Sequence, residues 1–84
     1  MDWKRAGRLR YGKEVIDLIS AFPGREWRMA ELVTYIVGVN ADRRARMSVR
    51  RQVLRVMEEL EQTGTVKVIP QEARGGTALY VWTV

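Results

Sequence analysis

Residues 47–84 carry the pattern that most constrains the fold. An amphipathic, basic segment runs as far as Gly64, and two runs rich in β-branched and aromatic residues follow it at 65–69 and 77–83. Such residues favour extended strands, and a glycine is the usual left-handed residue that ends a helix. The connecting segment 70–76 is too long for a two-residue hairpin turn, so we expect a larger loop between the strands. The sequence therefore predicts a helix followed by a β-hairpin.

Two shorter helices are predicted before this unit. Apolar side chains recur at helical spacing over residues 11–22, and the breaker pair Pro23–Gly24 ends the pattern. Over residues 29–36 apolar side chains stand at i, i+3, i+4 and i+7, and Gly38 lies where a helix stop is expected. We expect Trp27 to fill the space between these two helices. Three helices and a hairpin must bury their apolar faces together, which predicts an α+β domain.

The N-terminal residues are expected to form an arm. Residues 1–10 are basic, and Gly7 and Gly12 disfavour a stable helix there. We therefore divide the chain into a basic arm at 1–10 and one domain at 11–84. A chain of 84 residues has room for one small core and none for a separate catalytic lobe.

The start of the third helix is ambiguous, because the apolar periodicity lapses over residues 38–47. Asp42 is a good N-cap for an early start, and Ser48 is a good N-cap for a later one. The apolar pattern begins cleanly at Val49, so we expect Ser48 to cap a helix over 48–62. The apolar residues of this helix fall on one side: Val49, Val53, Val56, Met57 and Leu60.

The balance of charged residues indicates an anionic partner. Lys and Arg number 15 against 10 Asp and Glu, which gives a net charge of +5. Most of these cations are arginines, whose planar guanidinium groups form paired hydrogen bonds with phosphate or guanine. A nucleic acid is therefore the first partner to test.

Two residue types are missing, and their absence excludes several kinds of chemistry. The chain has no cysteine and no histidine. It therefore lacks the usual zinc ligands, the commonest general base and the Ser–His and Cys–His nucleophile pairs. We expect no enzymatic activity, no metal and no cofactor. The absence of cysteine favours an intracellular location, so we expect a cytoplasmic protein. The apolar runs fall far short of the roughly 18 residues that span a bilayer, so we expect no membrane partner.

The third predicted helix carries a basic face opposite its apolar side. At about 100° per residue, Ser48, Arg51 and Arg55 lie across from the apolar stripe. Glu58 and Glu59 stand close enough to pair with Arg55, so one interpretation is a solvated face crossed by ion pairs. We favour an anion-binding face, because arginines occupy the beginning of the helix and glutamates its end.

Four short segments carry a family resemblance: Arg28–Leu32, Ser48–Leu54, Leu60–Gly64 and Gly75–Tyr80. Through them, residues 11–83 resemble the small winged helix-turn-helix regulators of bacteria, archaea and their plasmids and viruses. The resemblance implies three helices plus a C-terminal β-hairpin wing. It also implies that the third helix enters the major groove of DNA, while the wing follows a neighbouring minor groove or the backbone.

The resemblance implies DNA contacts from the recognition helix and the wing tip: Ser48, Arg50, Arg51, Arg55 and Arg74. Arginine can bond O6 and N7 of guanine together, so we expect Arg51 or Arg55 to contact a base. The basic connection before the third helix is longer than the tight turn of the family. We therefore expect Arg43 on phosphate, and Arg44 and Arg46 either on phosphate or in the groove.

These observations favour sequence-specific binding of double-stranded DNA by a transcriptional regulator. One face of the last strand is expected to stay outside the core, carried either by Tyr80 and Trp82 or by Leu79 and Val81. Large apolar side chains rarely stay exposed together, so we expect a homodimer. Two alternatives remain open: a winged-helix module for protein interaction or assembly, and a protein that binds RNA or single strands through its aromatic residues.

Overall fold

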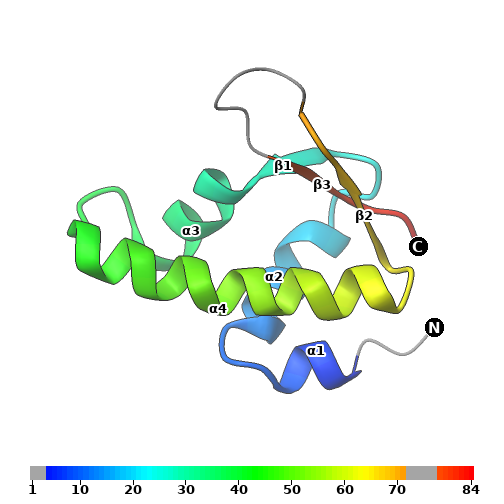
Figure 1. The fold of residues 1–84 in the computed structure, drawn as a ribbon, viewed down its shortest axis with the longest axis horizontal. Helices are drawn as coiled ribbons and strands as arrows, with labels where there is room; N and C mark the ends of the chain where they lie inside the picture. The colour runs from blue at the N-terminus through cyan, green and yellow to red at the C-terminus, as the bar shows by residue number, and fades with distance from the viewer. Residues whose placement is uncertain (1–3, 72–77) are drawn as a thin grey trace.

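The computed structural model describes residues 4–71 and 78–84 and shows an α+β fold (Figure 1). Four helices are described: α1 (Lys4–Arg8), α2 (Gly12–Ser20), α3 (Met29–Val37) and α4 (Arg43–Gln62). Three strands are described: β1 (Glu26–Arg28), β2 (Val66–Ile69) and β3 (Leu79–Trp82). The predicted α+β class, the helices expected over 11–22 and 29–36, and the two C-terminal strands are confirmed. No described helix is long and apolar enough to cross a membrane.

The strands form one antiparallel sheet in the order β1-β3-β2. The alternation along the central strand β3 turns Tyr80 and Trp82 into the core and leaves Leu79 and Val81 half-buried on the other face. The sequence does not predict β1, because its three residues give no alternation signal and the strand depends on pairing with β3. Trp27 is therefore a buried residue of the sheet, paired with Tyr80.

Helix α4 supplies the centre of the core. Figure 1 shows it crossing the molecule, with α3 and the sheet on one side and α1 on the other. Its predicted apolar side is confirmed, since five residues on it are buried: Val49, Val53, Val56, Met57 and Leu60. The other three helices and β2 pack against α4. The opposite side of α4 is therefore left in solvent.

Helix α4 begins at Arg43, which corrects the expected start at Ser48. The Asp42 carboxylate is the N-cap, and its Oδ1 accepts a hydrogen bond from the backbone N–H of Ala45 at 2.7 Å. Ser48 lies inside the helix and is exposed. The apolar pattern lapses before Val49 because the first turns of α4 project beyond the core, although their backbone is helical.

Replacing Asp42 by alanine should destabilise the protein, because the first turn of α4 would lose its capping acceptor. We expect the free energy of unfolding, measured by chemical denaturation, to fall by about 0.5–2 kcal/mol. Ser48→Ala is the matched control and should change it by less than about 0.5 kcal/mol. A larger loss of unfolding free energy in Ser48→Ala than in Asp42→Ala would contradict the cap at Asp42 and would indicate that the helix begins at Ser48.

The basic arm expected at 1–10 is helical in its described part, which is a second correction. Helix α1 packs on α4, with Ala6 buried in the core. Nε of Arg5 lies 3.7 Å from Oε1 of Glu59 on α4. The turn into α2 brings Gly12 so close to α1 that a Cβ there would overlap the carbonyl oxygen of Ala6. Gly12 therefore permits close packing of two helices, where the sequence indicates only a helix breaker.

A Gly12→Ala substitution should displace α1 or destabilise the fold. The added methyl group would meet backbone atoms, and overpacking of this kind costs about 1–3 kcal/mol. Gly7→Ala is the matched control, because its Cβ would make an ordinary contact, 3.9 Å from Cδ1 of Ile16. Gly7 lies inside α1, and alanine favours a helix over glycine by up to about 1 kcal/mol. We therefore expect Gly7→Ala to leave the stability unchanged or to raise it. Thermal unfolding measures both variants, and equal melting temperatures would contradict the close approach at Gly12.

Candidate nucleic-acid interface

The first two-thirds of α4 present six arginines: Arg43, Arg44, Arg46, Arg50, Arg51 and Arg55. All of them except Arg46 are exposed. In the described part of the chain, none of the six has a carboxylate within ion-pairing distance. Glu59, a partner for Arg55 in the sequence interpretation, pairs with Arg5 instead. Most of this positive charge is therefore presented to solvent.

The side of α4 opposite the buried stripe, which we call the outer face, carries one group of these residues. It holds four of the predicted site residues: Arg44, Ser48, Arg51 and Arg55. At about 100° per residue they lie within about 60° of one another, so they form one stripe along the helix. Arg51 stands about 180° from the buried Leu60 and is therefore the most outward arginine of the stripe.

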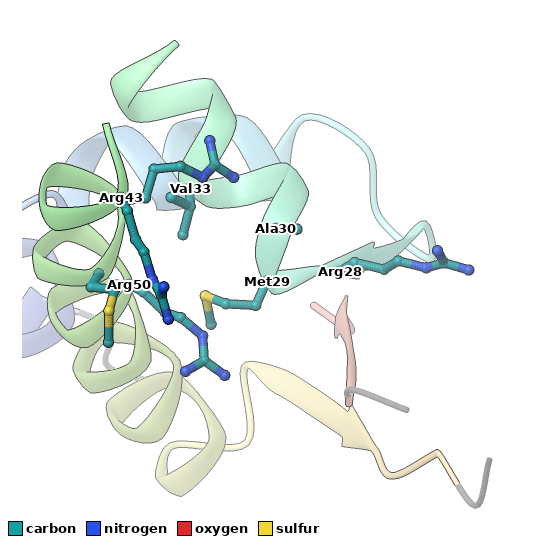
Figure 2. Close-up of a pocket in the computed structure, with 8 residues that line it drawn as sticks. Arg28, Met29, Ala30, Val33, Arg43 and Arg50 are labelled. Atoms are coloured by element: carbon teal, nitrogen blue, oxygen red, sulfur yellow. The ribbon is translucent and has the colours of Figure 1, made fainter. Parts of the chain in front are cut away.

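A second group borders a hollow between the first halves of α3 and α4, which we call the α3–α4 groove. Its volume is about 590 Å³, and its lining is mixed: Arg28, Met29, Ala30, Val33, Arg43, Arg46, Met47 and Arg50. Figure 2 shows Arg43 and Arg50 reaching from α4 towards α3, with Met29 between the two helices. Arg28 lies at the far end of the groove, and its side chain points away from α4.

Arg46 is held in place within this groove by a hydrogen bond. Its Nη2 donates to Oγ1 of Thr34 at 3.0 Å, in a partly buried position. The bond joins α4 to α3 and fixes the separation of the two walls. Arg46, predicted as a groove or phosphate contact, therefore also has a structural role.

The N-terminus of α3 has an acidic residue of its own. Oε1 of Glu31 accepts a hydrogen bond from the backbone N–H of Arg28 at 2.9 Å, and Oε2 accepts one from Nη2 of Arg25 at 3.4 Å. The Arg25 guanidinium also lies 3.9 Å from the centroid of the Trp27 ring. Arg25 is therefore engaged locally. Arg28 is not among the predicted site residues, because its place at the groove depends on how α3 crosses α4.

The second half of α4 has the opposite charge. Glu58 and Glu61 line a small hollow against Val68 of β2 and Tyr80 of β3. Burial raises the pKa of the Tyr80 hydroxyl above its ordinary value; Arg50 opposes this shift, while Glu61 and Glu58 add to it. The helix is therefore polarised along its length, and its arginine-rich part is the part that attracts an anion.

Seven of the eight predicted site residues lie on α4, and the structure divides them between the outer face and the α3–α4 groove. The eighth, Arg74, lies outside the described residues, as do the Gly75 and Gly76 that follow it. Across residues 4–71 and 78–84, no group of three acidic side chains is placed to hold a metal ion.

No known protein family, curated protein or solved structure matches this chain.

The raised pKa of Tyr80 predicts a loss of stability in alkali. The hydroxyl ionises more readily in the unfolded chain than in the folded one, so its contribution is complete below pH 10.0 and is lost as the pH rises through the folded pKa. A Tyr80→Phe variant should therefore lose less free energy of unfolding above pH 10.0 than the parent protein. Denaturation curves at several alkaline pH values measure this, and parallel losses in the two proteins would contradict it.

Proposed function

We propose that this chain is a winged helix-turn-helix protein that binds double-stranded DNA and acts as a transcriptional regulator. The observation that carries the proposal is the set of α4 arginines, which have no described carboxylate within ion-pairing distance. A B-form major groove is about 12 Å wide and admits one helix. The beginning of α4 lies at the edge of the molecule in Figure 1, where a duplex can reach it.

The order of the elements supports the winged-helix assignment. Helices α2, α3 and α4 match the three expected helices, and β2 and β3 match the two strands of the hairpin. The short strand β1 pairs with β3 directly before α3 begins. The sheet therefore joins the start of α3 to the hairpin. The wing at 70–76, with Arg74, remains part of the proposal.

The two surfaces of α4 take different parts in this proposal. Arg51 is the most outward arginine, and we assign it, together with Arg55, to O6 and N7 of guanine. Arg43 and Arg44 at the beginning of the helix, and Arg50 at the groove, are assigned to phosphates. Phosphate contacts set affinity and register without reading sequence.

Binding of RNA or single strands has less support. Base stacking needs exposed aromatic rings, whereas three of the aromatic residues, Trp27, Tyr80 and Trp82, are buried. Phe22 and Tyr35 are exposed, but neither lies on the arginine-rich helix α4. Trp3 lies outside the described residues. A module for protein interaction is the other alternative, because exposed arginines also attract acidic proteins. Failure of every duplex to bind would favour that alternative.

Replacing Arg51 and Arg55 together by alanine should weaken binding to a preferred site selected from a random duplex library. Each lost bidentate contact costs about 1–3 kcal/mol, which is about 5- to 150-fold in the dissociation constant. Gel-shift titration measures the change. The matched control is Arg8→Ala with Lys13→Ala, which removes the same charge from exposed positions on α1 and α2. The Arg8 and Lys13 variant should prefer the selected duplex over a random duplex by the same factor as the parent protein does.

The same titration at several salt concentrations tests the phosphate contacts. The logarithm of the association constant should fall by about 0.9 per contacted phosphate for each tenfold rise in salt. Equal binding by the parent protein and the Arg51 and Arg55 variant, or a flat salt response, would reject the proposed interface.

We also propose that the chain forms the homodimer expected from its sequence. The expectation rests on the face of β3 that lies away from the core, where Leu79 and Val81 are only half-buried. A two-fold dimer would present two copies of α4 to half-sites one helical turn apart, about 34–36 Å. Sedimentation should show a dimer whose population grows with concentration. A monomer alone at high micromolar concentration, with and without the selected duplex, would contradict this.

A further inference from the structure

The α3–α4 groove differs chemically from the outer face of α4, because its floor is apolar. Met29 and Val33 are buried at its base, and Met47 borders it from α4 with 47% of its surface exposed. The groove volume of about 590 Å³ lies within the roughly 300–1,000 Å³ of small-molecule sites. A phosphate of DNA needs only the cations of the groove. The apolar floor therefore has no part in phosphate binding.

Three guanidinium groups border this floor. Arg43, Arg46 and Arg50 stand on one side of α4 at spacing i, i+3 and i+7. Arg46 is fixed on Thr34, while Arg43 and Arg50 have no carboxylate within ion-pairing distance in the described part of the chain. Like charges placed together repel. An anion between them would relieve the repulsion and accept paired hydrogen bonds.

We propose that the α3–α4 groove binds a small aromatic carboxylate. The carboxylate would accept hydrogen bonds from Arg43 and Arg50, and the ring would lie over the floor of the groove against the exposed side chain of Met47. An aromatic ring suits this floor, because methionine sulfur makes favourable contacts with aromatic rings. Arg28 lines one end of the groove, and its side chain points away from α4 in Figure 2.

This site overlaps the proposed DNA interface, because Arg43 and Arg50 belong to both. A bound carboxylate would occupy these two guanidinium groups and lower the affinity for DNA. This regulatory consequence rests on the proposed function, whereas the binding of the carboxylate does not.

Naphthoate tests the proposal, with naphthamide as an uncharged control of the same shape. The full chain is titrated with each compound at neutral pH without DNA, and binding is followed by calorimetry and by changes in amide chemical shifts. Naphthoate should bind about tenfold more tightly than naphthamide, because bonds to its charged oxygens are the stronger ones. Equal affinities, or no binding of naphthoate, would overturn the proposal.

Paired variants test the location. Arg43→Gln with Arg50→Gln removes both guanidinium groups from the groove and should weaken naphthoate binding about tenfold or more. Arg51→Gln with Arg55→Gln removes the same charge from the outer face and should leave that binding unchanged. Met47→Ser trims the exposed rim of the groove and should weaken naphthoate and naphthamide alike. Equal losses in the two arginine pairs would indicate diffuse attraction and would overturn the proposal.

Competition with inorganic phosphate, and the effect of naphthoate on duplex binding, are measured last. Displacement of naphthoate by an equal concentration of phosphate would mean a simple anion site and would overturn the aromatic assignment; retention of naphthoate supports it. Saturating naphthoate, but not naphthamide, should raise the dissociation constant of the selected duplex. Naphthoate binding in a chain that binds no DNA would support this proposal and remove the proposed function. DNA binding without naphthoate binding would support the proposed function and overturn the carboxylate site.

Discussion

The buried stripe along α4 is the constraint on which the rest of the structure depends. Val53, Val56 and Leu60 have no exposed surface, and α1, α2, α3 and β2 all pack against this helix. The stripe fixes the rotation of α4 about its axis, and so it also fixes which side chains face outward. The position of the arginines is therefore a consequence of hydrophobic packing and not of interactions among the arginines themselves.

The sequence predicts those elements whose apolar residues repeat and whose ends are marked by local breakers. Helix α3 ends at Gly38, as its apolar spacing and that glycine indicate. The first turns of α4, the strand β1 and the helix α1 are not predicted. Each depends on one bond or on a distant partner: the cap at Asp42, the pairing of β1 with β3, and the packing of Ala6 on α4. Such contacts add no repeating apolar residues, so periodicity does not report them.

The composition of the candidate site is predictable from the sequence, but its arrangement is only partly so. The clustering of arginines at the beginning of α4 is visible in the order of residues. Their division between the outer face and the α3–α4 groove depends on how α3 crosses α4. That crossing brings Met29 and Val33 beside Arg43 and Arg50. Residues distant in the sequence thus combine charge and apolar surface in one place.

The first turns of α4 extend past the core, and no described residue of this helix before Val49 is buried. The segment is held by the cap at Asp42 and by the hydrogen bond from Arg46 to Thr34. Exchanges at its exposed positions therefore leave the interior packing intact and change stability little. The charge and shape of this surface can therefore change without compensating changes inside the domain.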